Sequence, residues 1–269
     1  MPLLDLKNIE FRYEKLHAGE GDFCLADINL SINSGEFVTI VGPNGSGKST
    51  LLKLISGILK RDSGELRLNS VDYNQISRKN LARTIAFVPQ SAQTIFPFSI
   101  YEIVMMGRTP YLNYLGLESR RDKEIVDDAL NMVNITHLKH KGINEVSGGE
   151  AQRAFIARAI VQEPDIILLD EPNAHLDIRH QLSVLDLIKE LNLSRKMTVI
   201  AVMHDLNLAG YYSSRIIMMK QGKVFRDDKA GIILTEENIR DVFGVESRVL
   251  VDQGTRAINV VIRPANFNL

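Results

Sequence analysis

The sequence has a single cysteine, Cys24, among its 269 residues. One thiol cannot form a disulfide within the chain, and such sparse use of cysteine is typical of reducing compartments. No run of apolar residues approaches the roughly 18 that a membrane-spanning helix needs, so we expect the chain itself not to cross a bilayer. The 18 glycines and 8 prolines also exclude a collagen-like repeat.

The chain also lacks a dominant charge of either sign. Its 32 Lys and Arg residues nearly balance its 33 Asp and Glu residues, which leaves a formal net charge of −1. This balance argues against binding nucleic acid through bulk positive charge. Hydrophobic residues make up 45% and charged residues 24%, as in ordinary globular proteins. We therefore expect a folded chain with no nucleic-acid partner.

The sequence alternates between short apolar runs and segments with helical spacing. Phe37–Val41 and Ile166–Leu169 are continuous apolar runs of the kind buried in parallel sheets. Strands that alternate with helices predict an α/β fold with a largely parallel sheet. Residues 91–150 have mainly helical patterns: Ser99–Glu102 has a capping-box pattern, and Asp122–Val133 is amphipathic. We interpret 91–150 as a helical insertion.

The second half of the chain continues the alternation. Ile178–Leu191 is a predicted helix with Leu182, Leu185 and Ile188 on one face. Beyond residue 230 we expect a short helix that reaches Phe243, followed by a terminal β-hairpin. The predicted domains are therefore a main domain, 1–230, and a short helix-and-hairpin extension, 231–269.

A glycine-rich segment follows the first apolar run and precedes a helical pattern. It fits G-x-x-x-x-G-K-[ST], the pattern of a phosphate-binding loop. Glycines let backbone N–H groups converge on phosphate oxygens, Lys48 adds a positive charge, and the Ser49 hydroxyl suits Mg²⁺. A chance match arises in about one chain in a hundred of this length, so we predict nucleotide binding. The residues assigned to it are Gly42, Pro43, Asn44, Gly45, Ser46, Gly47, Lys48, Ser49 and Thr50.

Two carboxylates, Asp170 and Glu171, end the second apolar run. Beside the phosphates of a P-loop protein, Asp170 can hold Mg²⁺ and Glu171 can polarise an attacking water. An acidic strand end is also a common solvated feature. The phosphate-binding loop alone leaves kinases, GTPases, recombinases and transport ATPases open.

A second glycine-rich segment narrows the choice among these classes of P-loop protein. It consists of Ser147, Gly148, Gly149 and Glu150. With it, the sequence resembles the ATP-binding subunits of ATP-binding-cassette (ABC) transporters, whose signature is Leu-Ser-Gly-Gly-Gln/Glu, although Val146 here replaces the leucine. The resemblance covers about residues 3–230. It implies a P-loop NTPase cassette with a RecA-like core, an antiparallel β subdomain and an α-helical subdomain. The segment also fits a mere capping box, and both interpretations can hold, because a glycine-rich helix start binds anions.

The resemblance implies further roles residue by residue. Tyr13 matches the aromatic residue that stacks on adenine, with an ordinary strand-end tyrosine as the alternative. His204 matches the histidine that contacts the γ-phosphate, and Asp177 matches the loop that crosses the dimer interface. In the family, the helix start that matches Ser147 contacts the γ-phosphate held by the other subunit, and the resemblance therefore implies a head-to-tail dimer of two copies around two ATP molecules. The implied catalytic residues are Glu171, His204 and Gln90, and the implied Mg²⁺ ligands are Ser49, Gln90 and Asp170.

Two further segments, Gly107–Tyr111 and Asp170–Gln181, resemble importers of iron chelates, haem and vitamin B12. The expected function is ATP hydrolysis that powers import of a metal chelate: ferric siderophore or haem first, with cobalamin and molybdate as alternatives. The implied partners are two integral-membrane permease subunits and, indirectly, a substrate-binding protein. The implied location is the cytoplasmic face of the inner membrane, as a peripheral subunit. A loop that only packs is the structural alternative for Gly107–Tyr111.

Three other classes of protein fit parts of the sequence. A soluble ABC ATPase that acts as an ATP-driven dimer switch in DNA repair or translation usually carries a coiled coil or two cassettes. This chain has one P-loop and no sustained heptads. A module that binds ATP without hydrolysing it would not need Glu171 and His204. A P-loop kinase would not need Ser147–Glu150.

Overall fold

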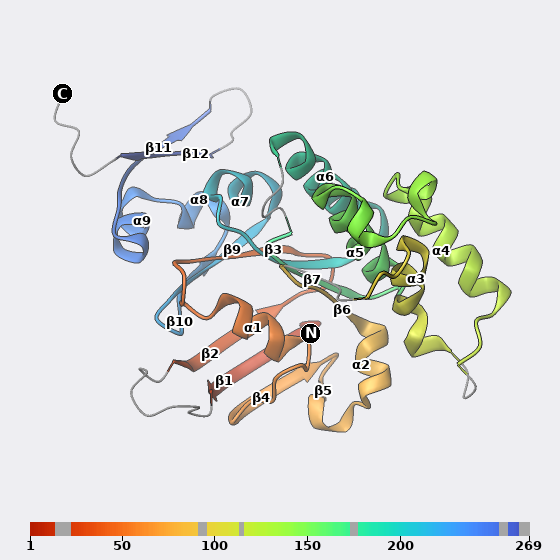
Figure 1. Ribbon diagram of the computed structural model, residues 1–269. Helices are drawn as coiled ribbons and strands as arrows, with labels where there is room; N and C mark the ends of the chain where they lie inside the picture. The colour runs from red at the N-terminus through yellow and green to blue at the C-terminus, as the bar shows by residue number, and fades with distance from the viewer. Residues whose placement is uncertain (14–22, 91–95, 113–115, 173–176, 253–257, 264–269) are drawn as a thin grey trace. The chain divides into compact units, whose positions relative to one another are not determined.

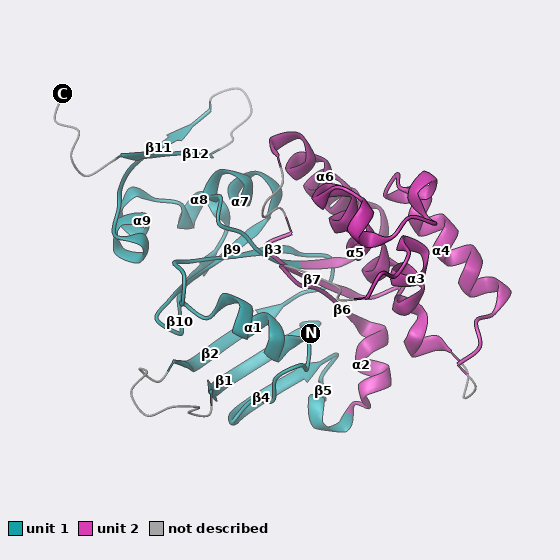
Figure 2. Cartoon of the chain, in the orientation of Figure 1, with its two compact units in different colours: residues 1–75, 200–269 teal, residues 76–199 magenta. Residues whose placement is uncertain are grey.

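The computed structural model describes residues 1–13, 23–90, 96–112, 116–172, 177–252 and 258–263. The chain divides into two compact units, unit 1 of residues 1–75 and 200–269 and unit 2 of residues 76–199 (Figure 2). The predicted boundary at residue 230 falls inside unit 1, and the predicted insertion, 91–150, falls inside unit 2. Both stay predictions, and each unit is described by itself.

Unit 1 contains a four-stranded antiparallel sheet in the order β2-β1-β4-β5 (Figure 1). Its strands are β1 (Leu4–Arg12), β2 (Cys24–Ile32), β4 (Ser63–Leu68) and β5 (Val71–Asp72). In the register of β1, Leu4 lies between Ile32 and Leu68. All three side chains are buried. Burial of every other residue on one face fixes this register, because a one-residue slip would turn the apolar set to solvent.

A second group of strands in unit 1 flanks the phosphate-binding loop. All five residues of β3 are buried, as the continuous apolar run predicted. β3 runs parallel to β9, and β9 pairs antiparallel with β10. The elements of this group are β3 (Phe37–Val41), α1 (Lys48–Ile55), β9 (Arg215–Lys220), β10 (Lys223–Asp228) and α7 (Leu206–Tyr212). The strand β8 (Thr198–Val202) leads along the chain from unit 2 into unit 1.

The C-terminal part of unit 1 forms the predicted helix that reaches Phe243 and the predicted hairpin, and it adds a short helix at Ala230–Ile233 that was not predicted. Thr235 caps the start of α9, because its side chain accepts a hydrogen bond from the backbone N–H of Asn238. The two terminal strands pair antiparallel, with Val249 opposite Val260. The elements are α8 (Ala230–Ile233), α9 (Glu236–Phe243), β11 (Glu246–Val251) and β12 (Ile258–Arg263).

Unit 2 combines two parallel strands with helices. β6 (Ile85–Val88) pairs with β7 (Ile166–Asp170) from Ile85 opposite Ile166 to Val88 opposite Leu169. The predicted capping box at Ser99 is confirmed, and Ser119 forms a second one. The helices are α2 (Arg78–Thr84), α3 (Ile100–Met105), α4 (Arg120–Met132), α5 (Gly148–Ile160) and α6 (Ile178–Arg195), with short 3₁₀ helices between them. The predicted helix at Ile178 is present as α6, where Leu185 and Ile188 are buried and Leu182 is 40% exposed.

The 3₁₀ helix η2 (Met106–Tyr111) holds Arg108 in the interior of unit 2. Its guanidinium donates to Asp122 Oδ1 at 2.9 Å, to Glu163 Oε2 at 2.9 Å and to the Val161 carbonyl at 2.6 Å. It also stacks 4.0 Å from the centre of the Tyr111 ring. These contacts join η2 to α4 and to the end of α5. The segment Gly107–Tyr111 therefore has a packing role within its own unit.

Candidate functional site

The phosphate-binding loop of unit 1 connects β3 to α1. Gly47 precedes α1 with a φ of 101°, and no side chain caps the helix. A helix start without a side-chain cap presents its first N–H groups and the positive end of its dipole to an anion. A Cβ on Gly42 would collide with the Met219 carbonyl, and a Cβ on Gly47 would lie 2.5 Å from Leu25 Cδ2. Gly42 therefore needs glycine because backbone blocks a side chain there, and Gly47 favours glycine because of its positive φ.

Lys48 carries the positive charge of this loop. The residue is 5% exposed, and its Nζ donates to the carbonyl oxygens of Gly42 at 2.8 Å and Pro43 at 3.0 Å. The ammonium group is therefore held within the curve of the loop by backbone oxygens. A cation in this position attracts phosphate oxygens strongly, because it is shielded from bulk water.

Tyr13 lies against the first turn of α1. Its hydroxyl is 3.3 Å from Thr50 Oγ1, and its ring packs edge-on against Phe11 with the ring centres 4.8 Å apart. Phe23 is the third ring of the cluster, 6.4 Å from Tyr13. The Tyr13 side chain stays 44% exposed. The structure thus places a partly exposed aromatic side chain next to the phosphate-binding helix.

His204 follows β8 in unit 1. The residue before it, Met203, donates its N–H to the carbonyl of Ile40 in β3 at 3.2 Å. This contact places His204 beside the strand that leads into the phosphate-binding loop. The side chain is exposed, so an imidazole is presented at the end of the sheet that bears the loop.

Unit 2 holds the predicted carboxylates at the ends of its parallel strands. Asp170 is the last residue of β7 and is 5% exposed. Because β6 and β7 are parallel, the residues after them meet at one edge, and Gln90 Nε2 donates to Glu171 Oε2 at 2.5 Å. Glu171 has a φ of 50°, in the left-handed region that side chains such as glutamate rarely adopt. Such strain costs about 1–3 kcal/mol and clusters at functional sites.

The glycine-rich signature begins α5. The Ser147 hydroxyl donates to Glu150 Oε2 at 2.7 Å, while the N–H of Glu150 donates to Ser147 Oγ at 3.4 Å, which completes a capping box. The bond from Ser147 also lowers the pKa of Glu150. The capping interpretation is thus realised in the structure, and the anion-binding interpretation stays a prediction for the same helix start.

Asp177 caps the start of α6 in the same unit. Its Oδ1 accepts from the backbone N–H of His180 at 2.8 Å and lies 2.8 Å from His180 Nδ1. These hydrogen bonds lower the pKa of Asp177. The His180 ring packs so near Gly149 that a Cβ there would lie 3.1 Å from His180 Cδ2. The structure therefore brings Asp177 and the signature together through His180, a residue whose only sequence signal is its place three residues after a helix cap.

Residues 25–174 match the family profile described as ABC transporter. The chain belongs to the ABC transporter family. Its fold is the ABC cassette, as the sequence predicted, and the chain is an ATPase of that family. Among the described residues, no helix combines the length and apolar character needed to span a membrane.

Similar ABC proteins have been described by function and by structure. The chain is 38% identical over 224 residues to the petrobactin import ATP-binding protein FpuC of Bacillus anthracis. The aligned region covers 83% of this chain and 82% of FpuC. It is 35% identical over 243 residues to the iron(3+)-hydroxamate import ATP-binding protein FhuC of Bacillus subtilis (strain 168), with 90% of each chain covered.

Two solved structures have the same fold. A chain described as belonging to a metal-chelate type ABC transporter in an inward-facing conformation superposes with a TM-score of 0.84 at 30% identity, over 98% of each chain. The dimeric cassette MJ0796 bound to ADP and Pi superposes with a TM-score of 0.74 at 32% identity, over 84% of this chain and 98% of that one. A nucleotide-binding cassette of this fold therefore forms dimers.

Proposed function

We propose that the chain hydrolyses ATP to power the import of a ferric siderophore through a partner permease. The relatives named for import of petrobactin and of iron(3+)-hydroxamate support this cargo. The segments Gly107–Tyr111 and Asp170–Gln181 agree with it in sequence. Haem and cobalamin are the competing chelates, and a soluble dimer switch is the competing function.

In this proposal unit 1 holds the nucleotide. The loop 42–50 binds the phosphates through backbone N–H groups and Lys48, and Tyr13 stacks on adenine. His204 contacts the γ-phosphate. The support is local: the uncapped start of α1, the glycines of positive φ at positions 42 and 47, and the exposed side chain of Tyr13 beside Thr50.

The observation that carries the proposed hydrolysis is the contact between Gln90 and Glu171 at 2.5 Å. An amide that donates to a carboxylate fixes the orientation of that carboxylate, and an oriented carboxylate can accept a proton from water. Glu171 then polarises the attacking water, and Gln90 orients both. Positioning and charge stabilisation supply most of the acceleration in phosphoryl transfer.

The proposed metal is Mg²⁺, with Ser49, Gln90 and Asp170 as ligands. A hydroxyl, an amide oxygen and a carboxylate are all hard oxygen donors, which is the ligand set that Mg²⁺ prefers. Asp170 fits because its carboxylate is buried at the end of β7. When bound, the ion would neutralise charge on the phosphate oxygens.

The proposed working form is a head-to-tail dimer of two copies. Ser147, Gly148, Gly149 and Glu150 of one copy face the γ-phosphate bound to the other, and Asp177 lies at the interface. The packing of His180 between Asp177 and Gly149 supports a shared surface. Two permease subunits hold the dimer at the cytoplasmic face of the cell membrane, and a substrate-binding protein delivers cargo to them from the other side.

The substitution Glu171→Gln tests the proposed hydrolysis. The amide cannot take a proton from water, so turnover should fall by at least about a thousandfold while ATP binding persists. The variant should therefore accumulate as ATP-bound dimers in light scattering, while wild-type protein returns to monomers. Near-normal phosphate release by this variant would refute the assignment of Glu171.

Reconstitution with the permease tests the proposed cargo. Proteoliposomes that contain both proteins and the binding protein should accumulate labelled ferric siderophore in an ATP-dependent manner, with haem and cobalamin assayed in parallel. Uptake of another chelate alone would reassign the cargo. Failure to associate with any integral membrane protein, with ATPase activity intact, would favour the dimer switch.

A further inference from the structure

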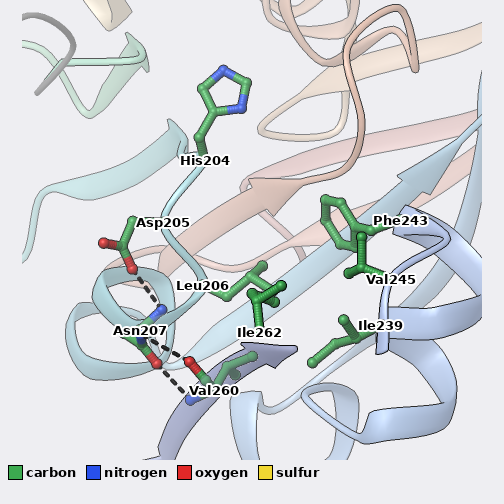
Figure 3. Close-up of a pocket in the computed structure, with 9 residues that line it drawn as sticks. All are labelled: His204, Asp205, Leu206, Asn207, Ile239, Phe243, Val245, Val260 and Ile262. Carbon is green, nitrogen blue, oxygen red and sulfur yellow. Dashed lines mark hydrogen bonds between the residues drawn. The ribbon is translucent and has the colours of Figure 1, made fainter. Parts of the chain in front are cut away.

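The side chain of Asn207, in α7, is joined to the terminal hairpin. Its Oδ1 accepts the backbone N–H of Val260 at 2.6 Å, and its Nδ2 donates to the carbonyl of Val260 at 3.3 Å (Figure 3). One amide thus pairs with both polar groups of one residue, as a neighbouring strand would. Since the N–H of Val260 is given to Asn207, it is not part of the ladder between β11 and β12.

The same turn of α7 lies directly after His204. Asp205 caps α7 by accepting the N–H groups of Asn207 at 2.8 Å and Leu208 at 3.0 Å. Asn207 is therefore held from both sides, by Asp205 through its backbone and by Val260 through its side chain. A displacement of Asn207 would be passed through this cap to the backbone of His204.

The hairpin has an apolar contact with the same region. A pocket of about 430 Å³ lies between the start of α7 and the terminal elements, lined by Leu206, Ile239, Phe243 and Ile262 among others. In Figure 3 the His204 ring points away from these side chains, at the rim of the pocket. The extension thus contacts the start of α7, which follows His204 in the chain, rather than the imidazole ring.

The extension is itself anchored at two other points. The N–H of Val249 in β11 donates to Glu236 Oε1 at 3.1 Å, which ties the hairpin to α9. Lys220 Nζ donates to the carbonyl of Asp241 at 2.5 Å, which ties α9 to β9. Since β9 pairs with β3, these contacts fix the extension to the sheet that bears the phosphate-binding loop.

We propose that Asn207 is a positioning residue through which the terminal hairpin sets the place of His204. This inference rests on the γ-phosphate contact assigned to His204 above. The pairing of Asn207 with Val260 holds the first turn of α7, and that turn fixes the backbone from which His204 reaches the nucleotide. The extension is thereby part of the catalytic geometry without touching ATP.

Two single variants remove the link from its opposite sides. Asn207→Ala deletes the amide, and Val260→Pro deletes the N–H that it accepts, which an edge strand tolerates because the ladder does not use that N–H. Each variant should lower kcat per bound ATP on the order of tenfold, because a small misplacement of a catalytic group is enough for such a loss. The affinity for ATP, measured by titration with a fluorescent analogue, should change by less than about twofold, since the loop 42–50 is untouched.

The double variant and a matched control complete the test. Asn207→Ala with Val260→Pro should be no slower than either single variant, because both break one link. Asn259→Ala, an exposed asparagine in the same strand, should match wild type. Because rates are expressed per bound nucleotide, a loss of folded protein does not imitate the expected result.

The outcomes separate this inference from the function on which it rests. If His204→Ala abolishes turnover while Asn207→Ala and Val260→Pro behave like Asn259→Ala, the positioning role is wrong and the proposed function stands. If His204→Ala turns over normally, the role of His204 is wrong and the positioning role falls with it. Multiplicative losses in the double variant would also overturn the link, because they would indicate two independent effects.

Discussion

Gly222 is a residue whose backbone supports the phosphate-binding loop from behind. Its N–H donates to the Ser46 carbonyl at 3.1 Å, and its own carbonyl accepts the N–H of Ala26 at 3.0 Å. Its φ of 75° belongs to the left-handed region, and a Cβ there would collide with the carbonyl of Cys24. The turn between β9 and β10 is therefore wedged between β2 and the loop.

Gly222→Ala should weaken ATP binding, in contrast to the same substitution at an unobstructed glycine. The added methyl group must push the turn away from Cys24, which breaks the bond to Ser46 and loosens the loop, so ATP affinity should fall about tenfold. Gly244→Ala is the matched control: its φ is 69°, yet nothing lies within 4 Å of the added Cβ. It should cost roughly 1 kcal/mol of stability and leave the affinity unchanged. Equal affinities in the two variants would contradict the supporting role of Gly222.

At the scale of elements, the helices of unit 2 are joined by the buried charge of Arg108. Its removal would leave Asp122, which is 6% exposed, without its cationic partner. Arg108→Ala should therefore lower the free energy of unfolding by about 3–5 kcal/mol. Arg120→Ala removes an exposed pair with Glu124 on the same helix and should cost less than about 0.5 kcal/mol. Urea unfolding measures the free energy of unfolding of both variants. Similar losses in the two would show that the buried contacts of Arg108 contribute no more to stability than the exposed pair does.

Asp122 also makes the stability of unit 2 depend on pH in the acid range. Hydrogen bonds from Ser119 and then Arg108 outweigh desolvation and lower the pKa of Asp122. A carboxyl whose folded pKa is depressed adds stability above its unfolded pKa of about 4 and loses it as the pH falls through the folded value. Asp122→Asn should flatten this loss of stability in acid, whereas Glu124→Gln, on the exposed face, should not. Unfolding curves from pH 7 to pH 2.5 would distinguish them, and parallel curves for all three proteins would refute the role of Asp122.

Local signals predicted some elements and could not predict others. The continuous apolar runs of β3 and β7 and the capping box at Ser99 depend on neighbouring residues, so the sequence predicted them. Helical spacing grouped Leu182 with Leu185 and Ile188, but it does not define how far each side chain is buried, and Leu182 is exposed. α7 was missed although Asp205 is a good cap, since seven residues carry too little periodicity. The left-handed φ of Glu171 has no local sequence signal.

At the scale of the whole molecule, the proposed reaction draws on residues of both units. A nucleotide that binds groups in both should slow hydrogen exchange in both, because it stabilises only the conformations that it contacts. In the Glu171→Gln protein, ATP should therefore protect amides around Lys48 and around Ser147. Adding Lys48→Ala should remove both protections together. Protection confined to unit 1 would contradict a shared nucleotide.

Long-range pairs are also the part of the candidate site that the sequence could not predict. The phosphate-binding loop and the acidic strand end were found because each is one contiguous motif. The contact of Gln90 with Glu171 spans 81 positions, and that of Asn207 with Val260 spans 53. Family resemblance supplied a role for Gln90, but no local pattern marks Asn207 as the partner of a strand. Only the folded chain shows which asparagine is structural in this way.

The strained backbone of Glu171 has a consequence for engineering the protein. Glycine or asparagine would adopt its φ of 50° more readily. Selection for heat resistance alone would therefore favour replacement at this position, by on the order of 1 kcal/mol. The same replacement would remove the carboxylate proposed to activate water. A search for a thermostable cassette would thus have to select for transport activity as well as for heat resistance. Replacing this one side chain would raise thermal stability and abolish ATP hydrolysis together.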